Sequence, residues 1–275
     1  MIQTPFREGD ALKFHGAANS YRLWKPKAVI DELTLLQDTY GVRNVKIADE
    51  MFVLNRDHVD AICGGIIDRG LDLNAWAYAR VDTVKRGPLS KMKKAGINWL
   101  ALGIESASEH VRDGVEKADY GRKEILETCR IIREEGINVI ANFIFGLPDD
   151  TRATMEETLD LAQEIMPEWV NMYSAQAYPG SKLYQQALKE GWPLPETWLG
   201  YSMHSYETQP LPTKTLSAAE VLEFSDNAFR IYFMNKNYLA MIQRKFGDTA
   251  VEQIKAMTAK RLLRRLLDEK EFRCA

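Results

Sequence analysis

Several apolar runs of this sequence end in polar or charged side chains. The run WLALGI, residues 99–104, leads directly into Glu105 and Ser106, and other apolar runs lead into Glu50 and Arg80. An ionised glutamate is among the costliest side chains to bury without a partner, so a carboxylate at the end of a core run indicates contact with a ligand. The carboxylates of Glu50 and Glu105 could also serve as the acid and the base of a hydrolase or lyase.

The elements that must position these residues follow a repeated pattern. Charged helical stretches stop at Gly41, Gly70, Gly96 and Gly136, and a short apolar run follows each glycine at once. Glycine is the expected left-handed residue after a helix, since it has no Cβ to clash. The alternation predicts right-handed βαβ units and a parallel sheet. We expect strands at 45–49, 74–80, 99–104, 138–145 and 169–177.

Helical periodicity and capping residues predict the remaining elements. We expect helices at 26–40, 57–68, 122–135 and 181–190, one more containing residues 91–95, and one capped by Asp150 or Thr151. The segment 192–215 is rich in proline and aromatic residues and should cross one end of the sheet irregularly. Ser217 and Glu220 form a capping box that opens a helix through Tyr232, and further helices should fill 238–269.

In parallel α/β folds, ligands bind at the carboxyl ends of the strands, where the βα loops converge. Five such ends carry polar residues or glycines: IADE, AYARVD, GIES, FGLPDDT and YPGS. The residues that could face one shared cavity are Glu50, Arg80, Glu105, Ser106 and Asn142. The sheet could be an open, doubly wound one or a closed or partial (β/α) barrel.

Each of these residues also has a simpler interpretation. Glu50 or Arg80 alone is more often a surface or capping residue, and Arg80 could pair with Glu105. Gly146 and Pro148 could be ordinary loop residues. Five polar ends on one face are harder to explain in this way together, and they indicate an α/β enzyme with a polar ligand site.

Composition excludes several classes of protein. The chain has 275 residues, of which 45% are hydrophobic and 27% charged, and its formal net charge is −3. The mildly acidic balance argues against a general nucleic-acid surface, and the locally basic stretch AKRLLRRLLDEKEFR is interpreted as a solvated amphipathic helix. We find no apolar run long enough to cross a bilayer and no signal peptide, so we expect no membrane association.

The cysteines share no metal-ligand spacing. Cys63 and Cys129 lie in helical patterns and are expected to be buried, neutral thiols, and Cys274 lies near the end of the chain. Nothing suggests a disulfide framework, which predicts a reducing, cytoplasmic location.

The motifs at the strand ends resemble, in order and spacing, the core of radical SAM enzymes. The matching pieces are IADEMF, AYARVD, LGIESAS, NFIFGLPDDT and AYPGSKLY, and the resemblance covers roughly residues 1–190. It is nearest to the subgroup whose members often carry an upstream cobalamin-binding domain. The resemblance implies a partial (β/α)6 barrel over residues 1–190, here without its first strand, and an irregular segment with a mostly helical extension over residues 191–275.

The resemblance also implies a site for S-adenosylmethionine beside a [4Fe–4S] cluster. Ala48, Asp49 and Glu50 stand where the family contacts the methionine amino group. Glu105 and Ser106 match the motif near the ribose and methionine. The other implied contacts are Arg80 and Asn142, which face the same cavity, and Phe145, Gly146 and Leu147, which lie near adenine.

The sequence departs from the family at the cluster. The family holds its cluster with three cysteines spaced CxxxCxxC, and this motif is absent. The opening MIQTPFREGD resembles the stretch that follows the motif, so we expect Met1 to lie just past it, as in a truncated gene, a fragment or a cluster-free descendant.

Three functions remain open. The resemblance favours the carboxyl-terminal part of a radical SAM enzyme, inactive as given, which would generate a 5′-deoxyadenosyl radical to modify a small molecule, with methylation as one candidate. Such an enzyme would need an electron donor such as flavodoxin or ferredoxin. The alternatives are a cluster-free module that binds S-adenosylmethionine or a nucleotide, and an unrelated barrel hydrolase or lyase. Tyr201, His204 and Tyr206 are candidates to face the substrate.

Overall fold

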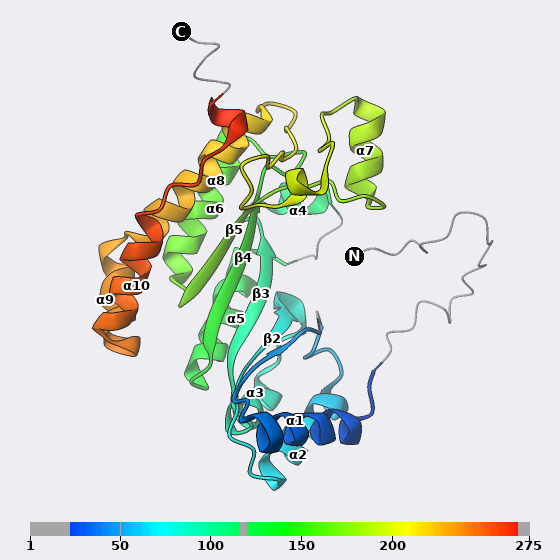
Figure 1. Ribbon diagram of the computed structural model, residues 1–275, viewed down its shortest axis with the longest axis vertical. Helices are drawn as coiled ribbons and strands as arrows, with labels where there is room; N and C mark the ends of the chain where they lie inside the picture. The colour runs from blue at the N-terminus through cyan, green and yellow to red at the C-terminus, as the bar shows by residue number, and fades with distance from the viewer. Residues whose placement is uncertain (1–22, 50, 116–119, 269–275) are drawn as a thin grey trace, which may run out of the picture.

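The computed structural model describes residues 23–49, 51–115 and 120–268. These residues contain one sheet whose neighbours follow the order β1-β2-β3-β4-β5. The strands are β1 (Asn44–Ile47), β2 (Asn74–Arg80), β3 (Ile97–Glu105), β4 (Asn138–Phe145) and β5 (Trp169–Ser174). All four pairings are parallel, and helices connect the strands (Figure 1). The predicted α/β class and partial (β/α) barrel are therefore confirmed.

Helices precede, connect and follow these strands. They are α1 (Pro26–Tyr40), α2 (Arg56–Asp68), α3 (Arg86–Lys94), α4 (Glu109–Asp113), α5 (Arg122–Glu134), α6 (Arg152–Ile165), α7 (Lys182–Glu190), α8 (Ala218–Phe233), α9 (Lys236–Phe246) and α10 (Asp248–Thr258). Two short 3₁₀ helices are η2 (Val81–Thr83) and η3 (Trp198–Tyr201). In the described part of the chain, no helix is both long and apolar enough to cross a membrane.

The core lies between the helices and one face of the sheet. Side chains of a strand alternate between its two faces, and on β2 Ala77 and Ala79 are buried while Tyr78 and Arg80 are half-buried. Leu100 and Leu102 of β3 are fully buried on the helix side. Each such leucine stabilises the fold by roughly 1.5–3 kcal/mol. The opposite face of the sheet therefore carries the side chains that can meet a ligand.

The glycine stops have the predicted backbone conformation. Gly41 ends α1 with φ 65°, and its N–H donates to Gln37 O over 2.9 Å. Gly70, Gly96 and Gly136 also have positive φ. Any residue with a Cβ would be strained in this conformation, so the repeated glycine is a consequence of the turn.

Some element boundaries differ from the predictions. β1 ends at Ile47, two residues early, and β5 ends at Ser174, three residues early. Ala175 N still donates to Phe145 O at the end of β4, but Ala175 O accepts from Leu211 N, so beyond Ser174 the chain stays buried and leaves the ladder. The helix α4 and both 3₁₀ helices were not predicted, because each is too short to show a helical period.

The segment after α7 lies at the carboxyl end of the sheet, the end that also carries α4 and α7 (Figure 1). Leu211 N donates to Ala175 O over 2.9 Å, and Lys214 N donates to Pro148 O over 3.2 Å. The predicted capping box of α8 is present: Ser217 N donates to Glu220 Oε2, and Glu220 N donates to Ser217 Oγ. The helix then packs along β5.

Candidate ligand site at the strand ends

A row of polar positions crosses the sheet near its carboxyl end. The strand register pairs Arg80 with Gly103, Gly103 with Asn142, and Asn142 with Asn171. Residues paired in this way lie side by side on the same face of a sheet. Asn142 Oδ1 accepts from Asn171 Nδ2 over 2.8 Å, and Asn142 Nδ2 donates to Leu102 O over 3.0 Å. Asn142 and Asn171 therefore form a hydrogen-bonded pair at one end of this row.

Glu105 lies next to this row, two residues beyond Gly103 on the same strand. Its φ is 67°, a conformation that costs a non-glycine residue of order 1–3 kcal/mol. A register shift between Gly103 and Glu105 accompanies the turn. A Cβ on Gly103 would lie 3.1 Å from Glu105 Oε1, so the carboxylate folds over the space that this glycine leaves.

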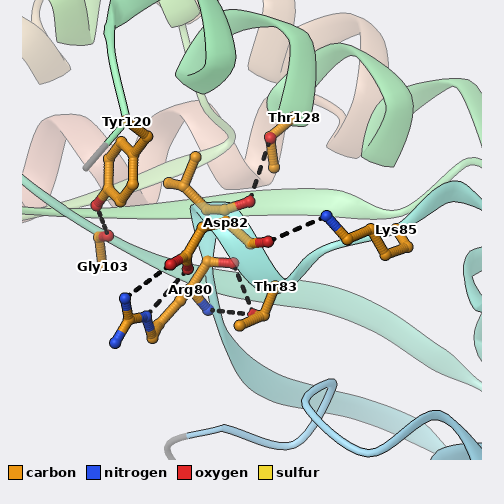
Figure 2. Close-up of polar contacts among 8 residues, drawn as sticks. Arg80, Asp82, Thr83, Lys85, Gly103, Tyr120 and Thr128 are labelled. Carbon is orange, nitrogen blue, oxygen red and sulfur yellow. Dashed lines mark hydrogen bonds and ion pairs between the residues drawn. The ribbon is translucent and has the colours of Figure 1, made fainter. Parts of the chain in front are cut away.

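Arg80 is held by Asp82, as Figure 2 shows. Its Nε and Nη2 donate to the two carboxylate oxygens of Asp82 over 3.0 and 2.7 Å. This bidentate pair raises the pKa of Arg80 further above its ordinary value, so the guanidinium stays charged. Pairing of Arg80 with Glu105, considered from the sequence, is replaced by pairing with Asp82.

Tyr120 is a member of the site that sequence reasoning missed. Its hydroxyl donates to Gly103 O over 2.9 Å (Figure 2), and its side chain is buried. Burial, and secondarily the charge of Glu105, raise the pKa of Tyr120 to about 12, so the hydroxyl stays protonated. The residue stands in the polar stretch ADYGR, where no periodicity or spacing marked it.

The loop after β4 is fixed by a buried carboxylate. Asp150 Oδ2 accepts from Gly146 N over 3.0 Å and from Leu147 N over 3.1 Å, and Asp150 Oδ1 accepts from Thr154 Oγ1 over 2.7 Å. Burial raises the pKa of Asp150, although these bonds lower it. Asp150 thus holds the loop, while Thr151 caps α6. The sequence indicated Asp150 only as a possible cap of the following helix.

Gly146 has a steric reason to be glycine. Its φ is 81°, and a Cβ there would lie 2.3 Å from Val221 Cγ1 of α8. The loop backbone therefore packs directly against α8.

Three predicted contacts have buried side chains. Ser106 is fully buried, and its hydroxyl lies 3.2 Å from Thr158 Oγ1 of α6. Phe145 is fully buried against Phe224 of α8, with ring centroids 5.0 Å apart. Leu147 is 3% exposed. At these positions only the backbone can reach a ligand without a rearrangement.

The loop after β1 is partly described. Ala48 is exposed and Asp49 is half-buried, and Asp49 Oδ1 accepts from Met51 N over 2.9 Å. Glu50 lies outside the described residues. The structure thus brings together Arg80, Gly103, Glu105, Asn142 and Tyr120, and it places Asp49 after the neighbouring strand.

The candidates in the segment after α7 have different surroundings. Tyr201 is buried and stacks on Tyr178, with ring centroids 5.8 Å apart. His204 and Tyr206 are exposed. Arg264, itself buried, holds this segment through Met203 O and Ser205 O.

The described residues do not fit an iron–sulfur cluster. Cys63 of α2 and Cys129 of α5 are buried, and burial raises the pKa of each thiol to about 12. Thiolates hold such clusters. Across residues 23–49, 51–115 and 120–268, no group of three or more His, Cys, Asp or Glu side chains could hold a metal ion.

This parallel half-barrel, with polar residues gathered at its strand ends, matches a known family. The model of the radical SAM superfamily matches residues 14–162, which is more than half of the sequence. The chain belongs to the radical SAM superfamily.

Curated relatives include two proteins of different activities. An uncharacterised methyltransferase of Pyrococcus horikoshii is 29% identical over 174 residues, covering 63% of this chain and 38% of the relative. The anaerobic magnesium-protoporphyrin IX monomethyl ester cyclase of Cereibacter sphaeroides is 32% identical over 220 residues, covering 78% of this chain and 35% of the relative. The chain thus spans less than two fifths of the length of either relative.

Solved structures share the fold. The cobalamin-dependent S-adenosylmethionine radical enzyme OxsB matches with a TM-score of 0.57 and 14% identity, over 86% of this chain and 41% of that enzyme. The radical S-adenosylmethionine methyltransferase TsrM of Kitasatospora setae, with cobalamin and a [4Fe–4S] cluster bound, matches with a TM-score of 0.56 and 17% identity, over 60% and 34%.

Proposed function

We propose that this chain is the S-adenosylmethionine-binding part of a radical SAM enzyme that modifies a small molecule. The observation that carries the proposal is the strained turn at Glu105. It holds a carboxylate over Gly103, on the face that also carries Arg80 and Asn142. Backbone strain of this kind persists only where the surroundings enforce it, and it clusters at ligand sites.

The residues have complementary roles in this proposal. The Glu105 carboxylate would accept charge-assisted hydrogen bonds from the ligand ammonium group or bonds from the ribose hydroxyls. Ala48, Asp49 and Glu50 would meet the methionine end, and Arg80 and Asn142 would line the cavity. The remaining contacts would come from the adenine-facing loop and from the backbone at Ser106. That loop comprises Phe145, Gly146 and Leu147, where the glycine lets backbone approach a flat base.

The described cysteines do not offer ligands for a [4Fe–4S] cluster. The buried thiols of Cys63 and Cys129 lie in separate helices, α2 and α5, and Cys274 lies outside the described residues, so we assign no described residue to a [4Fe–4S] cluster. We infer that these 275 residues alone do not generate a radical. We assign no residue to cobalamin, which the OxsB and TsrM structures contain, and we propose it only as a group of a longer protein.

The wider activity is proposed from the relatives. The methyltransferase and cyclase names support modification of a small molecule, with methylation as the leading candidate. We propose a flavodoxin or ferredoxin as electron donor, a cytoplasmic location, and a division into a barrel unit at 1–190 and a substrate-facing extension at 191–275.

Equilibrium dialysis with labelled S-adenosylmethionine tests the ligand assignment. We expect the unmodified chain to bind, and Glu105→Ala to weaken binding by about tenfold or more, since a hydrogen bond to a charged group contributes roughly 1.5–3 kcal/mol. Glu156→Ala on the exposed face of α6 is the matched control and should bind like the unmodified chain. Equal binding by both variants would refute the assignment of Glu105.

A cluster-free binding module is the second candidate. The absence of a metal-ligating group across the described residues favours it. The two candidates differ when the chain is joined to a cysteine-bearing partner segment: an enzyme would gain cleavage of S-adenosylmethionine, and a module would not.

A further inference from the structure

The turn at Glu105 needs support from its surroundings. Ser106 N donates to Ile104 O over 2.9 Å, and together with the φ of 67° at Glu105 this bond defines a γ-turn of the rare, strained kind. Glu105 and Met166 are the non-glycine residues with positive φ in the described part of the chain. Met166 ends a helix, whereas Glu105 ends a strand and carries a site carboxylate.

Arg112 and Tyr120 bond the backbone on both sides of this turn. Arg112 Nη1 donates to Ser106 O, immediately after Glu105, and Arg112 Nη2 donates to Tyr120 O. Tyr120 Oη donates to Gly103 O, two residues before Glu105, over 2.9 Å. The Arg112 guanidinium carbon lies 5.0 Å from the centroid of the Tyr120 ring. The two side chains therefore form one unit that brackets Glu105.

The burial of Arg112 is unusual for a purely structural residue. It is 1% exposed, and among the described residues it forms no ion pair and its Nε has no hydrogen-bond partner. A buried charge is costly unless it is well bonded, and Arg112 bonds the carbonyl of Ser106, beside the turn, and that of Tyr120. The Tyr120 hydroxyl is protonated at neutral pH, as any tyrosine is, and donates to Gly103 O.

We propose that Arg112 and Tyr120 are positioning residues that hold the strained turn and so aim the Glu105 carboxylate at the ligand. This inference rests on the proposed function, because it assumes that Glu105 meets S-adenosylmethionine. Neither residue needs to touch the ligand, since both act through the backbone at Gly103 and Ser106.

A double-mutant cycle on the full chain tests this role. We expect Tyr120→Phe to weaken binding of S-adenosylmethionine roughly tenfold, as loss of an orienting partner does at other sites. In the Glu105→Ala background the same change should have no further effect on affinity, because the residue it orients is gone.

Tyr238→Phe is the matched control. Tyr238 is also a buried tyrosine whose hydroxyl donates to a backbone carbonyl, that of Glu168, over 3.1 Å. It lies in α9 and bonds the residue just before β5 begins, at the amino end of that strand. Both variants should lose similar thermal stability, and only Tyr120→Phe should change affinity.

Hydrogen exchange without ligand gives an independent readout. The peptide that contains residues 103–108 should exchange faster in Tyr120→Phe and in Arg112→Gln than in the unmodified chain, and it should be unchanged in Tyr238→Phe. Unchanged exchange in both site variants would overturn the inference that the pair holds the turn.

The affinity outcomes separate the two proposals. If Glu105→Ala weakens binding while Tyr120→Phe behaves like Tyr238→Phe, the positioning role is wrong and the ligand site stands. If the unmodified chain does not bind, or Glu105→Ala has no effect, the proposed function fails and the aiming role fails with it. The exchange measurement then still decides whether the pair holds the turn.

Discussion

At the scale of single residues, Gly146 is a position where both packing and backbone conformation require glycine. Substitution by alanine would place a Cβ 2.3 Å from Val221 Cγ1 and add the strain of a φ of 81°. We expect Gly146→Ala to lower the free energy of unfolding by about 2–4 kcal/mol, combining overpacking with left-handed strain. Urea denaturation measures this change.

The control for this prediction is Gly191→Ala. Gly191 has a φ of 67°, but nothing lies within 4 Å of the added Cβ, so only the strain of about 1–2 kcal/mol should remain. Adding Val221→Ala to Gly146→Ala should recover part of the larger loss. Equal costs at the two glycines would contradict the packing account.

Asp150 gives a prediction about pH. Burial raises its pKa in the folded chain above the ordinary value of 3.8, so the folded state binds more protons than the unfolded state between these two values. This carboxyl therefore stabilises the fold less as the pH rises through that window. We expect the stability of Asp150→Asn, relative to the unmodified chain, to improve as the pH rises above about 3.8.

Denaturation series at several pH values measure this trend. Asp150→Ala serves as the second variant, because it leaves the buried amides of Gly146 and Leu147 without their acceptor, at about 1–3 kcal/mol each. A relative stability of Asp150→Asn that falls with rising pH would reverse the sign and refute the account.

Sequence reasoning found some site residues and missed others for a physical reason. Glu105 and Gly146 follow apolar strands directly, so their position at a strand end could be predicted. Arg112 and Tyr120 stand in a polar stretch without an apolar period, and both bond the backbone of the turn at Glu105, through Ser106 O and Gly103 O. The positive φ of Glu105 has no signature in residue type, because glycine usually takes such positions.

At the scale of elements, uninterrupted apolar runs were the most reliable signal. The bounds of β2 and β4 match the prediction, since each run is buried between neighbouring strands. β5 was predicted too long because Ala175–Ala177 remains buried after the ladder ends. The helix α4 was missed because its five residues, EHVRD, are too few to show a helical period.

Arg264 links the end of the described chain to the segment before α8. It forms a bidentate ion pair with Asp226 of α8 over 2.9 and 2.7 Å and also donates to Met203 O. We expect Arg264→Met to cost about 3 kcal/mol, because Asp226 loses its partner. Faster proteolysis within residues 202–208 should accompany the loss.

The control for the Arg264 prediction is an exposed ion pair. Arg152→Met breaks the pair with Glu156, whose side chains are 65% and 56% exposed, and should cost less than about 1 kcal/mol. If both variants lose the same stability, Arg264 does not hold the segment.

At the scale of the whole molecule, we predict that the purified chain, supplied with iron and sulfide, holds no stoichiometric [4Fe–4S] cluster. The thiols of Cys63 and Cys129 are buried on separate helices, and their high pKa keeps them protonated. Iron and sulfide analysis measures the content. The double variant Cys63→Ser, Cys129→Ser should bind the same small amount of iron and sulfide as the unmodified chain. A stoichiometric cluster in the unmodified chain that is lost in the double variant would show that these thiols are ligands and would contradict the prediction.

The parallel order of the sheet could be predicted from the glycine-punctuated repeat, and the family from motifs at the strand ends. Whether those ends form one ligand site depends on side-chain geometry that a repeat does not encode. After a register shift Glu105 pairs with Phe143, and its carboxylate lies over Gly103, the residue that pairs with Asn142.

The most direct test of the account is to locate S-adenosylmethionine by hydrogen exchange of the full chain. With ligand present, we expect slower exchange in peptides covering residues 103–108 and 145–150, at the carboxyl ends of β3 and β4, and no change in α9 and α10. Slower exchange only in helix peptides, for example those of α5 and α6, without a change at residues 103–108 and 145–150, would contradict the assignment of the ligand site.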